Sequence, residues 1–185
     1  MKVIMISGRA GAGKSTFTKF CMEYLSSKNQ ISTLVPFARG VKSTAKESFG
    51  WDGEKDDAGR RLLQGIGLLG RAYNENLWAE QAIHKIDMTF VIGSDTIFID
   101  DWRFPNEGKV VSEKYDACKI RINRPEEYLP LFGTPLYSDV SETSLPDYDE
   151  GIYDFVVTND DGLDELRVLA ESIIKSIFSE EETNV

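Results

Sequence analysis

The sequence KVIMIS, residues 2–7, is followed at once by GRAGAGKS, residues 8–15. The first part is short and apolar, which predicts a buried strand, and the residues that follow predict a helix over 14–27. The second part matches the pattern G-x-x-x-x-G-K-[ST] between that strand and that helix. In such a phosphate-binding loop (P-loop), glycines let backbone N–H groups converge on phosphate oxygens, and the helix N-terminus favours anions. We therefore expect the chain to bind a nucleoside triphosphate here.

The positions of this loop have distinct expected roles. Lys14 is expected to contact the β- and γ-phosphates, and the hydroxyl of Ser15 to help hold Mg²⁺. The alternative, a glycine turn with an incidental Lys-Ser pair, fits poorly with the spacing and the preceding strand. The residues expected to bind ATP in this segment are Gly11, Ala12, Gly13, Lys14, Ser15 and Thr16.

Strands and helices alternate along the rest of the chain. This alternation predicts an α/β fold with a central parallel sheet flanked by helices. Residues 125–151 contain four prolines and show little periodicity, so we expect a long excursion from the sheet that acts as a lid. The further strands are expected at 32–37, 96–100, 118–123 and 153–158, and the further helices at about 57–70, 74–88, 106–115 and 163–178.

Composition limits the classes of protein that fit. A chain of 185 residues with 41% hydrophobic residues is expected to form a single domain, 1–185. The net charge of −10 argues against binding to a nucleic acid polymer, and the lack of a long apolar run argues against a membrane protein, so we expect a soluble, cytoplasmic enzyme. Cys21 and Cys118 show no metal-binding or disulfide pattern and are expected to be core residues.

A second candidate motif is TIFIDD, residues 96–101. An apolar strand that ends in acids is typical of the element that approaches the metal in P-loop enzymes, although an Asp-rich turn has the same composition. The carboxyl ends of parallel strands share one edge of the sheet, which would bring these acids and Arg103 near the P-loop. We expect Ser15 and Asp101 to lie at the metal, with Asp100 as the alternative carboxylate.

Several later segments carry a more specific signal. Together they resemble the bacteriophage deoxynucleoside monophosphate kinases, a similarity that extends from Lys2 to about Leu169. The resemblance implies a three-layer P-loop fold of the nucleoside monophosphate kinase type, with an acceptor-binding insertion at about 37–90 and a lid at about 125–151. The segments are Phe37-Ala38 with Lys42, FGWDG at 49–53, Gly59-Arg60, LQGIG at 63–67, DWRFPNE at 101–107, Ser141-Glu142 and NDDG at 159–162.

The resemblance also implies an activity. It predicts a kinase that uses ATP and Mg²⁺ to convert a deoxynucleoside monophosphate (dNMP) to its diphosphate, in the host cytoplasm if the chain is viral. A homodimer is also compatible with the resemblance. Asn159 is expected near the donor adenine, with a helix-capping turn as the alternative. The residues expected to bind the acceptor are Phe37, Lys42, Arg71, Trp78, Asp101, Trp102, Arg103 and Glu142.

Arginines are the natural partners of a phosphate acceptor, because their guanidinium groups bind phosphate through two parallel hydrogen bonds. We expect Arg71 and Arg103 to hold the acceptor phosphate. Arg124 is expected to arrive with the lid and neutralise charge on the transferring group. Arg60 and Arg61 cannot both face one pocket, since neighbours on a helix point about 100° apart. The residues predicted to be catalytic are Lys14, Asp101, Arg103 and Arg124.

Two other functions remain open from the sequence. One is a P-loop kinase for another phosphorylated small molecule, such as phosphomevalonate or a dephospho-cofactor. The other is a nucleotide-binding subunit without catalytic activity, which would serve regulation or DNA packaging. The acidic composition and the acceptor-like segments argue against the second.

Overall fold

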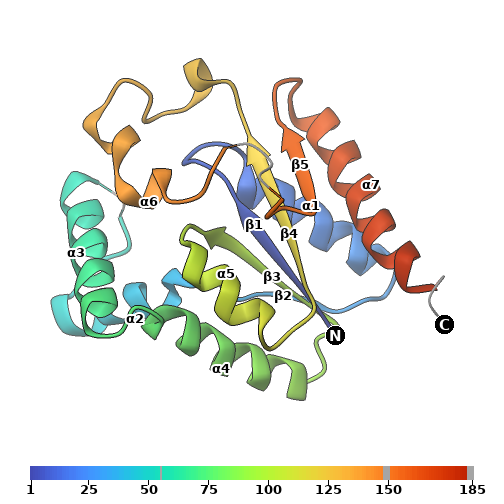
Figure 1. The fold of residues 1–185 in the computed structure, drawn as a ribbon, viewed down its shortest axis with the longest axis horizontal. Coiled ribbons are helices and arrows are strands. Elements are labelled where there is room, and N and C mark those ends of the chain that lie inside the picture. Colours follow the sequence, from blue (N-terminus) through green and yellow to red (C-terminus); the bar gives the residue numbers. More distant parts are fainter. Residues whose placement is uncertain (55, 148–150, 183–185) are drawn as a thin grey trace.

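The computed structural model describes residues 1–54, 56–147 and 151–182. Its centre is a five-stranded parallel sheet in the order β2-β3-β1-β4-β5 (Figure 1). Because β1 is the middle strand, the P-loop that follows it has a strand end on either side. The strands are β1 (Lys2–Ser7), β2 (Ser32–Leu34), β3 (Thr96–Trp102), β4 (Ala117–Asn123) and β5 (Phe155–Thr158).

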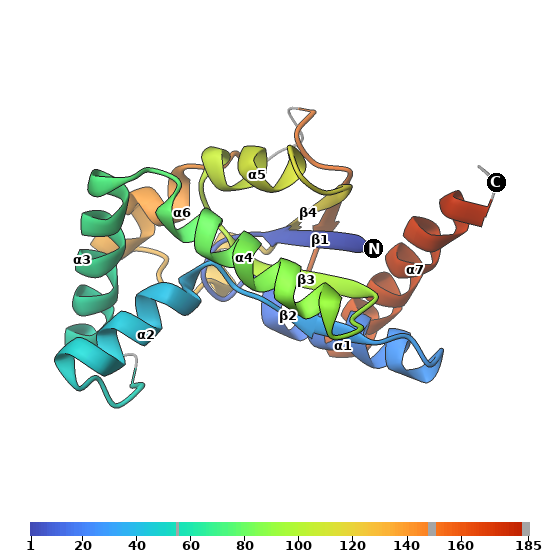
Figure 2. The ribbon, with the colours of Figure 1, turned by 90° about the horizontal axis from the view of Figure 1, so that it is seen from below.

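Helices cover both faces of the sheet (Figure 2). α1 (Lys14–Ser27) and α7 (Leu163–Glu182) pack on one face, and α4 (Leu77–Val91) and α5 (Pro105–Ser112) on the other. The alternation of β1 explains both layers, because Ile4 and Ile6 point into the first core and Val3 and Met5 into the second. The predicted three-layer α/β fold is confirmed.

Two further helices lie beside the carboxyl edge of the sheet, α2 (Ala38–Phe49) and α3 (Asp57–Tyr73) (Figures 1 and 2). They form a small core of their own with Trp78 of α4. The sequence did not predict α2, because the helix buries only Val41 and Ala45 and so shows a thin apolar stripe. This pair of helices makes one wall of the candidate site described below.

A covering segment, residues 125–147, runs from β4 across the P-loop toward α3 (Figure 1). It contains only short helices: η1 (Glu126–Tyr128), η2 (Pro135–Ser138) and α6 (Val140–Thr143). Its contact with the P-loop is close, since a Cβ atom at Gly11 would lie 2.3 Å from the ring of Pro130. Residues 148–150, the end of the predicted lid, lie outside the described residues.

The predicted elements are present with small shifts at their ends. β2 stops at Leu34 rather than residue 37, because the chain turns there toward α2. Cys21 and Cys118 are buried in the core as predicted. The apolar residues of segment 62–69 differ in burial: Ile66 is buried, whereas Leu68 and Leu69 are exposed. In the described part of the chain, no helix is both long and apolar enough to cross a membrane.

Candidate functional site

The P-loop has the backbone conformation that its glycines allow. Gly11 and Gly13 have φ angles of +80° and +103°, in the region that other residues avoid. Space also requires glycine at position 13, because a Cβ atom there would lie 2.5 Å from the amide nitrogen of Asn159. That amide donates a hydrogen bond to the carbonyl of Ala12 at 2.9 Å. Asn159 therefore fixes the loop from the end of β5.

Lys14 points back into the loop. Its Nζ atom donates to the carbonyls of Gly8 at 2.7 Å and Arg9 at 2.9 Å, and the residue is 9% exposed. Burial lowers the pKa of Lys14 to about 8; the positive charge of Arg103 acts in the same direction and the carboxylate of Glu142 opposes it. An ammonium group stripped of water in this way would gain strongly from a bound polyphosphate.

The two acids at the end of β3 have different partners. Asp100 accepts a hydrogen bond from the hydroxyl of Ser15 at 2.8 Å. Asp101 accepts from the backbone N–H groups of Phe37 at 2.8 Å and Ala38 at 3.0 Å, and so anchors the start of α2. The structure thus places Asp100, and not the predicted Asp101, beside the serine of the expected metal site. A hydroxyl and a carboxylate oxygen are suitable ligands for Mg²⁺.

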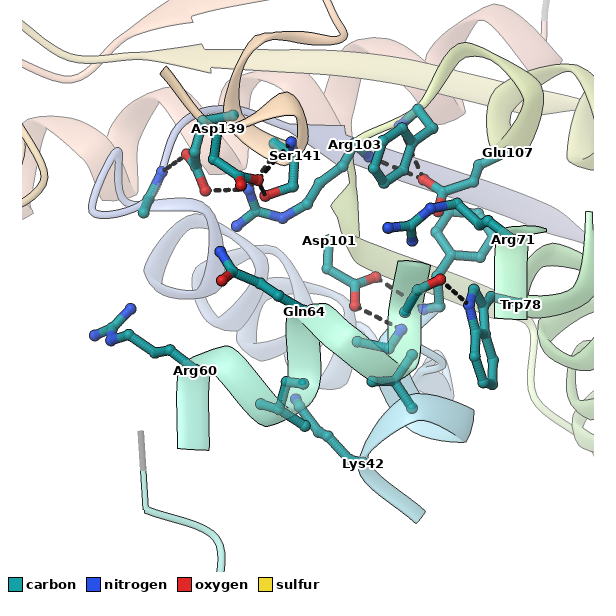
Figure 3. A pocket seen from close by; sticks show the side chains of 18 of the residues that line it. Lys42, Arg60, Gln64, Arg71, Trp78, Asp101, Arg103, Glu107, Asp139 and Ser141 are labelled. Atoms are coloured by element: carbon teal, nitrogen blue, oxygen red, sulfur yellow. Dashed lines mark hydrogen bonds and ion pairs between the residues drawn. The ribbon is translucent and has the colours of Figure 1, made fainter. Parts of the chain in front are cut away.

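A cavity of about 280 Å³ lies between the P-loop, the end of β3, α2, α3 and the covering segment (Figure 3). We call it the α2–α3 cavity. Its walls combine apolar surface with convergent charged groups, as ligand sites do. It is lined by Ala10, Phe37, Ala38, Val41, Lys42, Arg60, Leu63, Gln64, Gly67, Arg71, Trp78, Asp101, Arg103, Phe104, Glu107, Leu131, Leu136, Asp139, Ser141 and Glu142.

The two predicted acceptor arginines both reach this cavity but differ in their contacts. Arg103 donates to the carbonyl of Ser141 at 2.7 Å and forms a short ion pair with Glu142. Arg71 lies over the ring of Phe104, with 4.3 Å between its guanidinium carbon and the ring centre, and forms no hydrogen bond with the described residues. Its donors are therefore available to a ligand in the cavity.

Glu107 is a buried carboxylate in the same wall. Its Oε2 atom accepts from the backbone N–H groups of Arg103 and Phe104, both at 3.0 Å, and so caps α5. The residue is 6% exposed, and burial raises the pKa of this carboxyl to about 7. The sequence prediction gave Glu107 no role. The Pro-Asn-Glu pattern at 105–107, with glutamate at the third helical position, is the signal that indicates this cap.

A second cavity, of about 390 Å³, lies on the outer side of the P-loop. We call it the P-loop cavity. Arg124 lines this cavity and not the α2–α3 cavity, and its guanidinium donates to the carbonyl of Gly11 at 3.1 Å. Arg124 therefore lies beside Lys14 and Ser15 of the P-loop, and its contact with the transferring group stays a prediction. The lining residues are Gly11, Gly13, Lys14, Ser15, Thr16, Arg124, Asn159, Gly162, Leu163 and Leu166.

A partly buried ionic cluster fixes the covering segment to the sheet. Asp147 pairs with Arg9 of the P-loop at 2.8 Å and also with Arg121 of β4. Arg121 is 2% exposed and donates to the hydroxyl of Ser7 at 2.9 Å. Arg9 also lies over the ring of Tyr137, 4.2 Å from its centre. Sequence reasoning missed this cluster, because its members are up to 138 residues apart.

Most of the predicted site residues meet around the two cavities. Ala12 and Trp102 are the exceptions, because neither lines either cavity. Ala12 is 1% exposed, and Trp102 is 3% exposed and packs edge-on against Tyr153 in the core. The predicted contact between Trp102 and a substrate base is therefore corrected. The reason is a shift in the pairing of β3 with β1 between Ile99 and Trp102, which places Trp102 in the same core as Ile97 and Ile99, whereas Asp101 and Arg103 line the cavity. His84, to which no role was assigned, lies on α4 away from both cavities.

No protein-family model matches the chain. Among curated proteins, it is similar to the uncharacterized protein ORF77 of Ictalurid herpesvirus 1 (strain Auburn), with 30% identity over 145 residues. The aligned region covers 78% of this chain but 59% of that protein, so the chain spans little more than half of its relative.

Several solved kinases share the fold. The APS kinase of Mycobacterium tuberculosis in complex with AMPPNP and APS aligns with a TM-score of 0.52 and 13% identity, over 94% of this chain and 95% of that one. A sugar kinase from Janibacter sp. HTCC2649 aligns with a TM-score of 0.52 and 14% identity, over 92% of both chains. The shikimate kinase of Acinetobacter baumannii in complex with shikimate aligns with a TM-score of 0.50 and 14% identity, over 97% of this chain and 93% of that one. The chain therefore has the fold of P-loop small-molecule kinases.

Proposed function

We propose that this protein is an ATP-dependent deoxynucleoside monophosphate kinase that forms a deoxynucleoside diphosphate. The observation that carries the proposal is that adjacent residues of one P-loop line two separate cavities. Ala10 faces the α2–α3 cavity, whereas Gly11 and Gly13 face the P-loop cavity. Two substrates bound in these cavities would have their phosphates meet at the loop, as direct transfer between them requires.

The donor is assigned to the P-loop cavity. Backbone N–H groups of the loop, Lys14 and the N-terminus of α1 would hold its phosphates. Arg124 and Asn159 also line this cavity; Asn159 would contact the nucleoside, and Arg124 would neutralise charge on the phosphates. Ser15 and Asp100 would hold Mg²⁺, which supplies charge neutralisation on the β- and γ-phosphates when bound.

The acceptor is assigned to the α2–α3 cavity. Arg103 and Arg71 would hold its phosphate, while the rings of Phe37 and Trp78 and the side chain of Lys42 line the remaining walls. The acceptor needs no general base, because its phosphate oxygen is already ionised near neutral pH. The protein's contribution is then to align the two phosphates and to neutralise their charge.

The proposal is tested by an acceptor screen. Purified protein with ATP and Mg²⁺ is assayed for ADP release with each of the four common dNMPs and, in parallel, with phosphomevalonate, dephospho-coenzyme A, APS and shikimate. We expect turnover with at least one dNMP and none with the other acceptors. Turnover with any of the other four acceptors, or ATP turnover that no acceptor stimulates, would refute the proposal.

Arg71 offers a prediction with a matched control on the same helix. Replacing Arg71 with alanine is expected to raise the KM for the dNMP by about 10- to 100-fold, since a hydrogen-bonded charge contributes about 1.5–3 kcal/mol. The KM for ATP is expected to stay the same, because Arg71 does not line the P-loop cavity. Arg61→Ala is the control, as Arg61 is exposed on α3 and lines neither cavity. Equal effects of the two substitutions on the dNMP KM would contradict the assignment.

A further inference from the structure

The carboxylate of Glu142 lines the α2–α3 cavity and contacts the P-loop. Its Oε2 atom accepts a hydrogen bond from the backbone N–H of Ala10 at 2.7 Å, and its Oε1 atom is paired with the guanidinium of Arg103. The side chain of Glu142 is 7% exposed. A single buried carboxylate thus connects an amide of the P-loop with an arginine that the proposed function assigns to the acceptor phosphate.

The short helix α6 holds Glu142 in this position. Asp139 begins the helix and accepts from the backbone N–H of Ser141 at 2.9 Å and from its hydroxyl at 2.6 Å. The carbonyl of Ser141 in turn accepts from Arg103 at 2.7 Å. Arg103 is therefore bound by two consecutive residues of the covering segment (Figure 3). The carboxylate is part of an ordered set of contacts and not a loose surface side chain.

A carboxylate and a phosphate compete for the same partners. Both are anionic acceptors that bind backbone N–H groups at a P-loop and guanidinium groups, and charge-assisted bonds of this kind are strong. With Glu142 in place, the N–H of Ala10 and one amino group of Arg103 already donate hydrogen bonds to its carboxylate. A second anion close to the carboxylate would also be repelled, all the more because the site is partly buried. The two phosphates of the proposed reaction therefore cannot meet until Glu142 moves away.

We propose that Glu142 stands in for a substrate phosphate and selects a phosphate acceptor over water. The inference rests on the proposed function. A phosphate acceptor carries the charge needed to displace the carboxylate from Arg103, whereas water does not. Without an acceptor, Glu142 keeps the transfer point closed. It thereby suppresses the hydrolysis of ATP, in which water oxygen forms the new bond to the γ-phosphorus, the bond to ADP breaks and a proton passes to solvent.

The test compares four forms of the protein: the wild type, Glu142→Gln, Glu142→Asp and the control Glu127→Gln. Glutamine has the shape of glutamate without its charge, and aspartate keeps the charge on a side chain that is too short to span Ala10 and Arg103. Glu127 is an exposed acid of the same covering segment and lines neither cavity. Affinity for AMPPNP with Mg²⁺ is measured by calorimetry without acceptor, and ADP release is measured with and without dNMP.

We expect both Glu142 variants to bind AMPPNP at least tenfold more tightly than the wild type and to release ADP without acceptor at least tenfold faster. Glu127→Gln should match the wild type in both. Wild-type values in all variants would overturn the role of Glu142 and leave the proposed function intact. Weaker AMPPNP binding with loss of dNMP turnover in the Glu142 variants would overturn it as well, since Glu142 would then position Arg103. Failure of the wild type to bind AMPPNP would overturn the proposed function and this inference together.

Discussion

Replacing Lys14 with methionine is expected to lower the rate of phosphoryl transfer to a dNMP by at least about 100-fold. Methionine keeps the length and most of the volume of the side chain but removes the positive charge that lies inside the P-loop turn. The ammonium group already sits against the carbonyls of Gly8 and Arg9, where the loop would wrap a phosphate. The measurement is ADP release at saturating ATP and dNMP, with thermal unfolding to show that the variant is folded. An unchanged rate would remove the P-loop assignment.

The pH dependence of the wild type gives a second measure of the same group. Burial lowers the pKa of Lys14 to about 8, so in the free enzyme the amine is charged below pH 8 and becomes neutral above it. The value of kcat/KM for ATP, which reports groups of the free enzyme, is therefore expected to fall about tenfold per pH unit above pH 8. Lys14→Arg should abolish this fall, because the guanidinium stays charged throughout the range. A profile that is flat to pH 9.5 in the wild type would show that Lys14 keeps an ordinary pKa.

The P-loop and the three layers could be predicted because their determinants are local. The pattern of residues 8–15 specifies its own backbone, and the continuous apolar run of β1 indicates that the strand is buried on both faces. α2 was missed because its stability depends on a distant group. The carboxylate of Asp101, 63 and 64 residues away, takes the N–H groups of Ala38 and Phe37 at its start. A helix that begins on a tertiary contact shows no capping residue in its own sequence.

The sequence could not assign individual site residues, because it does not show toward which side of the strand each side chain points. Their position at a strand end places Asp100, Asp101, Trp102 and Arg103 at the carboxyl edge of the sheet, where the site lies. The sequence does not indicate which face of the strand borders the cavity. The structure settles this, with Asp101 and Arg103 lining the cavity and Trp102 in the core. The contacts between the covering segment and the P-loop could not be predicted for another reason. Its irregular chain has no period, so only the family resemblance placed Glu142 at the site, and nothing in the sequence brought Asp147 to the P-loop.

The same covering segment lies against the P-loop along several residues. Three consecutive residues of the P-loop are in contact with it: Arg9 with Tyr137, Ala10 with Glu142, and Gly11 with Pro130. These contacts come from different parts of the segment, so the segment and the loop hold each other in place. A nucleotide that enters the P-loop must therefore displace some of these contacts, and the ion pair of Glu142 competes most directly with phosphate.

Replacing Glu107 with glutamine is expected to make the protein more stable at neutral pH, by up to about 3 kcal/mol. Burial raises the pKa of Glu107 from 4.5 to about 7, so between these values the folded protein holds a proton that the unfolded chain has lost. The folded state therefore binds more protons, and stability falls as pH rises through this window. Glutamine is neutral at every pH, and its amide oxygen can still accept from Arg103 and Phe104.

The quantity to measure is the difference in unfolding free energy between Glu107→Gln and the wild type, from urea denaturation at several pH values. This difference should be small near pH 4.5 and grow until about pH 7, because only the wild type pays for ionising a buried carboxyl. Asp101, whose pKa burial also raises, is present in both proteins, so its titration largely cancels in the difference. Glu113→Gln is the control at the exposed end of α5, with a difference that should stay nearly constant. A difference for Glu107→Gln that is equally constant would show that this carboxyl ionises as it does in water.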